Sequence, residues 1–288
     1  MPDPHLALEQ AADAERKGDF ERAQQAYERV LADPISLELR STTLCRLSNL
    51  HRNRCELGRA LDLASESRAV ARRANSTALE AEALNAEAAV HQIRGDFARS
   101  RALLEELLAL TTDNRLRGIA LQNLGAIAAQ SGNLGDAERF FGESYGCFMR
   151  AGFQRGELFA LNNYGRAALD RGNHVLAHEV LEQAVELARS LDDGEMIALS
   201  TLNFAEALMR ENELTRAEDM VSTALGYFAH TGNSWRHIEC LRLLGELNAR
   251  NGTVAVARRC YEDGLAIATR IGAQYEARAL RSALVALG

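Results

Sequence analysis

The chain is poor in residues that interrupt helices or favour sheets. Its 288 residues include only three prolines, the last of them Pro34, and only 6% are aromatic. β-Branched residues are sparse, whereas alanine and leucine dominate. With 47% hydrophobic and 25% charged residues, the composition indicates a folded helical protein and excludes an all-β or a disordered chain.

Long apolar runs, a secretion signal and paired cysteines are missing as well. No apolar stretch approaches the roughly 20 residues that cross a bilayer, and the first residues are acidic, unlike a secretory signal. The five cysteines include no C-x-x-C pair, which argues against a zinc knuckle or a disulfide framework. The net charge of −7 makes nucleic acid an unexpected partner. We therefore expect a cytoplasmic protein that binds neither membranes nor nucleic acid.

What the chain does contain is an internal repeat, which decides the fold before any single motif does. Segments such as GDFERAQQAY (18–27) and GNLGDAERFF (132–141) are copies of one pattern. Each copy has a small residue at the same position, and these anchors recur every 37 or 40 residues. The seven anchors are Ala23, Ala60, Ser100, Ala137, Ala177, Ala217 and Ala257.

A second apolar element lies about twelve residues before each anchor. In LQNLGAIAAQSG and LRLLGELNARNG, large apolar residues are three and four positions apart, which places them in one stripe on a helix. The Gly-Asn or Gly-Asp that follows ends this helix, and the next apolar run starts another. Cys55 and Asn212 replace two of these turn glycines. Each repeat is therefore predicted to be a helical hairpin.

These residues resemble the tetratricopeptide repeat. The clearest matches are Leu121, Leu124, Gly125, Ala128, Ala137 and Phe141 in the fourth copy, Leu161, Tyr164, Gly165, Ala168, Ala177 and Leu181 in the fifth, and Leu241, Leu244, Gly245, Ala257 and Tyr261 in the seventh. The period exceeds the family's usual length of about 34 residues. It is similar to the longer variety found in kinesin light chains, spindle-orientation scaffolds and sensor domains of some bacterial transcription regulators.

The resemblance implies an all-α fold, an α-solenoid wound as a right-handed superhelix. A single hairpin cannot bury its apolar stripe and must stack on its neighbours. We expect one domain, 1–288, of about seven hairpins and a C-terminal capping helix. The expected hairpins are 4–40, 41–80, 81–117, 118–157, 158–197, 198–237 and 238–273, and the capping helix is 274–287.

Catalytic and nucleotide-binding motifs do not point to an enzyme. Residues 142–146 fit G-x-S-x-G, but a nucleophile elbow needs a strand that turns into a helix, and Ser144 falls inside a predicted helix. Neither a Walker motif nor G-x-G-x-x-G occurs. We expect a protein that is not an enzyme and has no catalytic residues and no cofactor.

Histidines offer a weak indication of a metal site. His174 and His178 are four residues apart on a predicted helix, a spacing that could place two ligands on one face. Spacing indicates no third ligand, and His174 occupies a position that is apolar in sister repeats, so we expect no metal. His51 and His91 share one position of the repeat and are interpreted as packing residues.

The face of each first helix that the repeats do not need for stacking is the candidate binding surface. At 100° per residue, Phe159, Asn163 and Arg166 lie opposite the apolar stripe of their helix. In tetratricopeptide proteins this surface lines the concave side of the superhelix and holds a peptide or a partner helix, so the resemblance implies the same role here.

Asparagines recur on this surface. Asn123, Asn163 and Asn203 are 40 residues apart at one position of the repeat, and Gln122 and Asn162 stand beside two of them. An amide offers both a donor and an acceptor, which suits it to hold a peptide backbone, and asparagine is a poor residue for a helix interior. The alternative is that these amides bond to an adjacent helix or merely tolerate solvent.

Hydrogen bonds alone would not hold a ligand, because ordering a peptide costs about 1–2 kcal/mol per residue. Phe159 and Leu199 share one register with Ile119 and could add apolar contacts, or could instead cover a neighbouring helix. The complete set of candidate ligand-binding residues is Asn49, Asn85, Gln122, Asn123, Phe159, Asn162, Asn163, Arg166, Leu199, Asn203, Arg210 and Arg242.

Arginines are concentrated between residues 40 and 73, in an otherwise acidic protein. Helical spacing scatters them over several faces, which favours a solvated surface. The alternative is that they bind an acidic segment of a partner.

Together these features predict a non-enzymatic scaffold or adaptor that binds a peptide segment of another protein in its concave groove. The alternative is a regulatory sensor that binds a small molecule or a signalling peptide and controls an effector, such as a transcription regulator, on another chain. A homodimer formed through one end of the solenoid is compatible with the sequence, which does not determine it.

Overall fold

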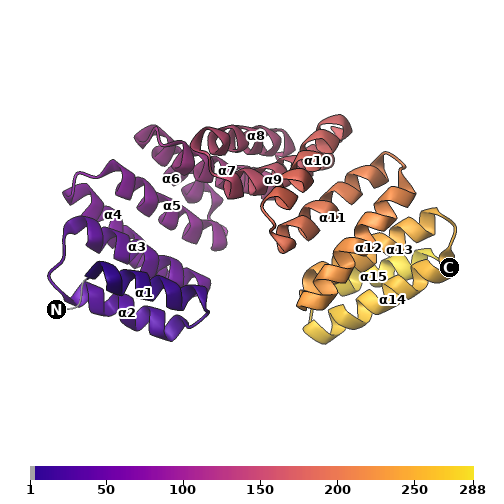
Figure 1. The fold of residues 1–288 in the computed structure, drawn as a ribbon, viewed down its shortest axis with the longest axis horizontal. Coiled ribbons are helices and arrows are strands. Elements are labelled where there is room, and N and C mark those ends of the chain that lie inside the picture. The colour runs from indigo at the N-terminus through magenta and orange to yellow at the C-terminus, as the bar shows by residue number, and fades with distance from the viewer. Residues whose placement is uncertain (1–3) are drawn as a thin grey trace. The chain divides into compact units, whose positions relative to one another are not determined.

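The computed structural model describes residues 4–288, and this part of the chain forms fifteen helices and no strand (Figure 1). The all-α fold of stacked helical hairpins is therefore confirmed. The chain divides into two compact units, residues 1–156 and 157–288, each with its own hydrophobic core. We describe each of them separately as unit 1 and unit 2.

Unit 1 contains four hairpins, α1/α2, α3/α4, α5/α6 and α7/α8. Their bounds are α1 Pro4–Arg16, α2 Phe20–Ala32, α3 Leu37–Asn53, α4 Leu57–Arg73, α5 Thr77–Ile93, α6 Phe97–Leu110, α7 Asn114–Gln130 and α8 Leu134–Ala151. The first helices of consecutive hairpins lie side by side, since α3 contacts α5 and α5 contacts α7.

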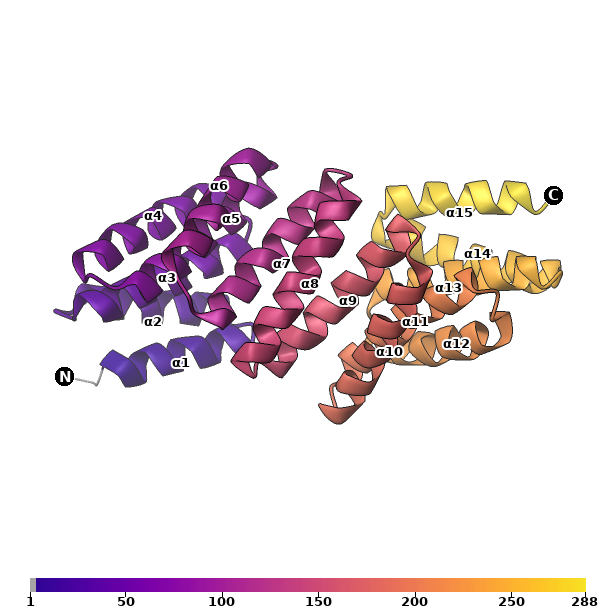
Figure 2. The same ribbon diagram turned by 90° about the horizontal axis from the view of Figure 1, so that it is seen from above.

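Unit 2 begins within α9, which runs from Gln154 to Arg171. The helices that follow are α10 His174–Ser190, α11 Gly194–Arg210, α12 Leu214–Thr231, α13 Ser234–Arg250, α14 Val254–Ile271 and α15 Gln274–Ala286. The last helix, α15, packs on α14 through Ala277 and Leu280 and ends the stack (Figure 2).

A single left-handed residue makes the turn inside each hairpin. At these positions φ lies between 61° and 82°, a region that glycine enters without strain. Two of the seven are not glycine: Cys55 has φ 61° and Asn212 has φ 65°. These are the two substitutions that the repeat pattern placed at turn positions, so the sequence located all seven turns. The seven residues are Gly18, Cys55, Gly95, Gly132, Gly172, Asn212 and Gly252.

The seven anchors of the repeat are all fully buried. They lie on the second helix of each hairpin, where a small side chain lets the two helices approach closely. Ser100 is the exception in chemistry, and its hydroxyl donates a 2.8 Å hydrogen bond to the backbone carbonyl of Ala88 on the facing helix. Its polar group is thus satisfied inside the core, which explains why serine is tolerated in place of alanine.

Glycines on the first helices pack against large side chains on the second helices. A Cβ atom on Gly165 would lie 2.3 Å from Cγ of Leu181, and one on Gly245 would lie 2.2 Å from Cε1 of Tyr261. Both distances are far below the separation of about 3.5–4.0 Å at which carbon atoms pack. In each case the glycine of the Leu-Gly or Tyr-Gly pair makes room for the residue sixteen positions later.

In unit 2 the largest fully buried residues include Phe204 and Phe228, and in unit 1 they include Tyr27 and Leu84. No helix within residues 4–288 combines the length and the apolar character that crossing a lipid bilayer requires.

Candidate functional site

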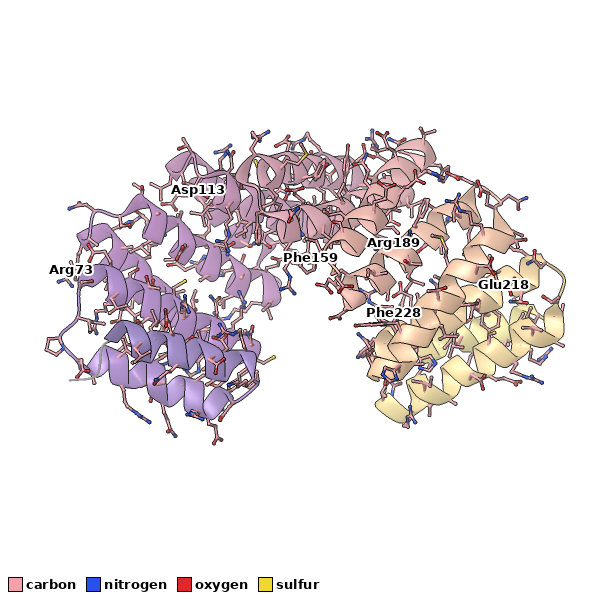
Figure 3. The ribbon with its side chains drawn as sticks, in the orientation of Figure 1. Arg73, Asp113, Phe159, Arg189, Glu218 and Phe228 are labelled. Atoms are coloured by element: carbon pink, nitrogen blue, oxygen red, sulfur yellow. The ribbon has the colours of Figure 1, made fainter. Side chains whose placement is uncertain are left out.

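Unit 2 brings six of the predicted residues together around one cavity, which we call the inner cavity. It has a volume of about 220 Å³ and lies on the first helices α9, α11 and α13. The predicted residues that line it are Phe159, Asn162, Asn163, Arg166, Leu199 and Asn203, and Arg236 and Glu239 complete it. Phe159 is 40% exposed on α9 (Figure 3).

Asn162 and Asn203 form hydrogen bonds within the protein. Asn162 is buried, and its Nδ2 donates to the carbonyl of Leu158 at 3.0 Å and to Oγ of Ser200 at 2.9 Å. Asn203 donates from Nδ2 to Oδ1 of Asn162 at 2.8 Å. This network joins α9 to α11, which agrees with the alternative interpretation that these asparagines bond to an adjacent helix. A ligand could bond only to amide atoms that the network does not use.

Asn163 has a different environment. It is half-buried, lines the inner cavity, and makes no hydrogen bond to any described residue. Its amide can therefore offer a donor and an acceptor to a ligand without breaking a contact within the protein. Beside it, Arg166 bonds through Nη1 to Oε2 of Glu206, so this guanidinium is already paired.

A larger cavity adjoins the inner one and shares Arg236 and Glu239 with it. This outer cavity, of about 610 Å³, lies between the N-terminal parts of α11, α13 and α15. Arg242, one of the predicted binding residues, lines it and pairs with Glu246 at 3.5 Å. We refer to the inner and outer cavities together as the unit-2 groove.

Unit 1 has a polar cavity of about 470 Å³ on α3, α5 and α7. Asn49 and Asn85 line it, together with Ile119. Asn123 donates from Nδ2 to Oδ1 of Asn85 at 2.9 Å, so this amide pair joins two neighbouring hairpins. Asn49 makes no hydrogen bond within residues 4–288.

Three predicted residues line none of these cavities: Asn123, whose contact with Asn85 is given above, Gln122 and Arg210. Gln122 accepts a 3.3 Å hydrogen bond at Oε1 from Oγ of Ser144. Arg210 is exposed at the end of α11 and lines none of the cavities above. The part of these three residues in binding a ligand stays a prediction.

Ser144 and His178, which belong to the serine and histidine motifs, form contacts within the protein. Ser144 is fully buried within the continuous helix α8, and its hydroxyl donates to the carbonyl of Gly118 at 2.8 Å. His178 pairs with Glu211 at 2.8 Å and packs edge-on against Phe204. Among the described residues, no three His, Cys, Asp or Glu side chains are grouped as a metal site.

His51 and His91 are buried at the ends of α3 and α5. His51 contacts Glu56 through Nδ1 at 2.5 Å, and Nδ1 of His91 lies 3.5 Å from Asp96. Burial lowers the pKa of His91, so the neutral ring is favoured there. Both rings pack where each first helix meets its turn.

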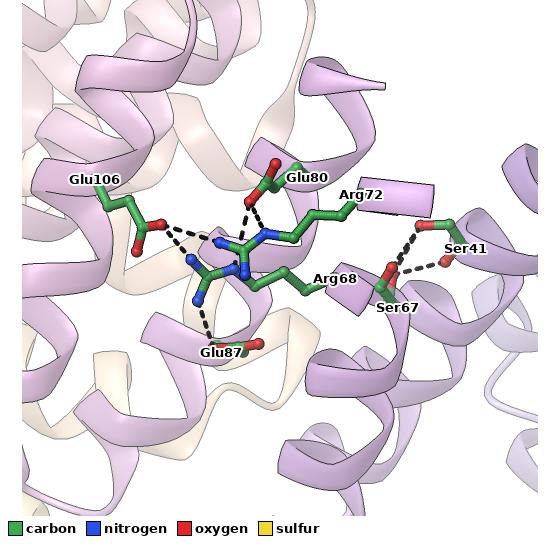
Figure 4. Close-up of polar contacts among 7 residues, drawn as sticks. All are labelled: Ser41, Ser67, Arg68, Arg72, Glu80, Glu87 and Glu106. Atoms are coloured by element: carbon green, nitrogen blue, oxygen red, sulfur yellow. Dashed lines mark hydrogen bonds and ion pairs between the residues drawn. The ribbon is translucent and has the colours of Figure 1, made fainter. Parts of the chain in front are cut away.

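Several arginines between residues 40 and 73 are paired within the chain. Arg68 and Arg72 project from α4 toward glutamates of α5 and α6 (Figure 4). Both arginines bond to Glu106, and Nε of Arg72 lies 2.5 Å from Glu80. Arg68 also lies 3.7 Å from the buried Glu87. These two side chains are thus engaged with acids that follow them in the sequence.

Sequence reasoning missed the two exposed aromatic rings of the outer cavity. Trp235 is 57% exposed at the start of α13, and Tyr275 is 81% exposed at the start of α15. The two are 40 residues apart and so share one register of the repeat, which holds Glu195 one repeat earlier. An aromatic in two consecutive copies, at a position that is charged in the preceding copy, was the available signal.

The fold and these surfaces define a class of protein, a solenoid of helical hairpins. Residues 116–190 match the tetratricopeptide repeat family, and the resemblance drawn from the repeat pattern is thereby confirmed. This fold is typical of proteins that interact with other proteins. A comparison with curated proteins finds no match.

Solved structures with the same fold support this assignment. The apo form of RapI superposes with a TM-score of 0.69 at 13% identity, covering 93% of this chain and 77% of that one. A Rap protein complexed with Competence and Sporulation Factor gives 0.69 at 15% identity, covering 99% and 85%. A signal transduction ATPase with a tetratricopeptide repeat sensor from Pyrococcus horikoshii gives 0.70 at 13% identity, covering 99% and 47%.

Proposed function

We propose that this protein is a non-catalytic adaptor that binds an extended peptide segment of a partner in the unit-2 groove. The observation that carries the proposal is the inner cavity, where the unpaired amide of Asn163 lies beside the exposed ring of Phe159. An extended peptide needs this combination, because its backbone requires amide partners and its side chains require apolar contacts.

The magnitudes favour a shared role for polar and apolar contacts. A hydrogen bond from Asn163 would contribute about 1 kcal/mol, or roughly fivefold in affinity. Covering the 40% of Phe159 that is exposed and the exposed part of the half-buried Leu199 would contribute about 1–2 kcal/mol each, which is less than a full burial contributes. Together these terms offset part of the cost of ordering a short segment, which is about 1–2 kcal/mol per residue.

The fold comparison supports binding of this kind without naming the partner. The similar Rap structure was solved with Competence and Sporulation Factor bound. At 15% identity this likeness concerns the fold.

The test is a selection of random dodecapeptides displayed on phage against the purified full chain. Enriched peptides are then synthesised and their affinities measured by calorimetry. Phe159→Ala should weaken binding about tenfold or more, and Asn163→Ala about fivefold. Gln92→Ala is the matched control, because Gln92 is a half-buried amide on α5 of unit 1 that lines neither cavity of the groove, and it should leave affinity unchanged.

Two results would contradict the proposal. One is that no peptide is enriched, and the other is that enriched peptides bind Phe159→Ala and wild type equally. A small molecule that raises the melting temperature in the absence of any peptide would instead favour the regulatory sensor.

A further inference from the structure

The outer cavity has a chemical character that the inner cavity lacks. Trp235 and Tyr275 stand on neighbouring first helices, α13 and α15, at the same register, and both are exposed. Large aromatic rings exposed to solvent beside a cavity are typical of binding surfaces, where tryptophan and tyrosine are enriched among the residues that contribute most to the binding energy.

Acidic groups in this cavity exceed the basic groups that are free. Arg236 pairs with Glu239 at 2.6 Å, and Arg242 is engaged by Glu246, so both guanidinium groups are occupied. Glu195 and Glu276 also line the cavity and form no ion pair with any described residue. The unbalanced charge facing the cavity is therefore negative.

Helix electrostatics explain only part of this arrangement. Glu195 and Glu276 lie in the first turns of α11 and α15, where a carboxylate interacts favourably with the helix dipole. The dipole gives no reason for exposing an indole and a phenol at the same register. The combination of two rings with two unpaired carboxylates matches a cation with a flat face.

We propose that the outer cavity binds an arginine side chain of the peptide segment, so this inference rests on the proposed function. The guanidinium stacks on Trp235 and Tyr275, and its N–H groups face the carboxylates of Glu195 and Glu276. Arginine fits better than lysine because its planar, weakly hydrated group both stacks on rings and donates several hydrogen bonds.

The same phage selection tests this inference. We expect the enriched peptides to share arginine at one aligned position, with lysine a weaker substitute. In a synthesised peptide, replacing that arginine by glutamine should lower affinity about fivefold to tenfold. The difference should shrink in high salt, because the carboxylates are accessible to solvent.

A pair of variants separates the charges from the fold. Glu195→Gln/Glu276→Gln should weaken the arginine peptide and leave the glutamine peptide unaffected. The control is Glu262→Gln/Asp263→Asn on α14, which removes the same charge from exposed positions outside the cavity and should change neither affinity.

Trp235 supplies a local readout, because it is the only tryptophan of the chain. Binding of the arginine peptide should change its emission and protect it from a neutral quencher. Enriched peptides without a common arginine, or binding that leaves Trp235 emission unchanged, would overturn this inference while peptide binding itself stands. The absence of any enriched peptide would overturn the proposed function as well.

Discussion

Replacing Gly165 by alanine should destabilise the protein, although alanine is the better residue for a helix. Alanine favours a helix interior by about 1 kcal/mol over glycine. At this position, however, the new Cβ would lie 2.3 Å from Cγ and 2.5 Å from Cδ2 of the fully buried Leu181. Relieving that overlap requires α9 and α10 to separate, and such overpacking costs about 1–3 kcal/mol. After the gain in helix propensity of about 1 kcal/mol is subtracted, we expect a net loss of up to about 2 kcal/mol.

Gly226→Ala is the matched control, because Gly226 lies inside α12 and a Cβ there would meet nothing within 4 Å. It should stabilise the protein by about 0.5–1 kcal/mol. The assay is urea unfolding followed by far-ultraviolet circular dichroism, where a change of 1 kcal/mol moves the midpoint by about 0.3–1 M. A shift of both variants in the same direction would refute the steric argument.

A compensating substitution makes the prediction sharper. One repeat later, the positions of Gly165 and Leu181 hold Ala205 and Val221, both fully buried. Gly165→Ala/Leu181→Val copies that pair and should recover about 1 kcal/mol relative to the sum of the single changes. Additive effects would show that the two side chains do not compete for space.

Three other changes follow from the described contacts. Cys55→Gly should raise the free energy of unfolding by about 0.5–1 kcal/mol, because it relieves a left-handed residue; an unchanged urea midpoint would contradict this. Asn162→Ala should lower the free energy of unfolding by about 1–3 kcal/mol, because it leaves buried hydrogen-bond partners unsatisfied. Asn163→Ala should change it by no more than about 0.5 kcal/mol. Equal losses would contradict the assignment of the two amides. Burial raises the pKa of Glu87, so ionisation of this carboxyl destabilises the fold, and the penalty vanishes as the pH falls. Glu87→Gln should therefore be more stable than wild type at about pH 7 and should lose that advantage toward about pH 4. Urea titrations at the two pH values measure the difference.

The hairpins and their turns were predictable because they depend on local chemistry. A small anchor such as Ala137 and a turn residue such as Asn212 are each fixed by the geometry of a single hairpin. That geometry is the same in every copy, so the period of the sequence transfers it from one repeat to the next.

The roles of the two adjacent asparagines could not be separated in this way. Asn162 and Asn163 differ by 100° around α9, and both fall near the surface that the sequence assigns to binding. Which amide meets Ser200 and Asn203 depends on how α11 is rotated and spaced against α9, and that is set by packing between hairpins. The periodicity of one helix carries no information about that rotation.

The outer cavity was missed for a related reason. The predicted binding residues are ones that recur from copy to copy, whereas Trp235 and Tyr275 depart from the repeat at a position that is Glu195 in the preceding copy. A residue that breaks the pattern on an exposed face is not required for stacking. Departures of this kind are therefore the positions at which we expect binding residues.

The distribution of cysteines allows local unfolding of the protein to be measured from the rates at which its thiols react. Cys55 is exposed and should react at once with a thiol reagent, whereas Cys45, Cys147 and Cys240 are buried. Burial raises the pKa of Cys45 and of Cys240 to about 12, so each reacts only when its helix opens. Cys45 and Cys147 lie in unit 1 and Cys240 lies in unit 2. A comparison of their labelling rates therefore shows whether the two units open locally together or independently.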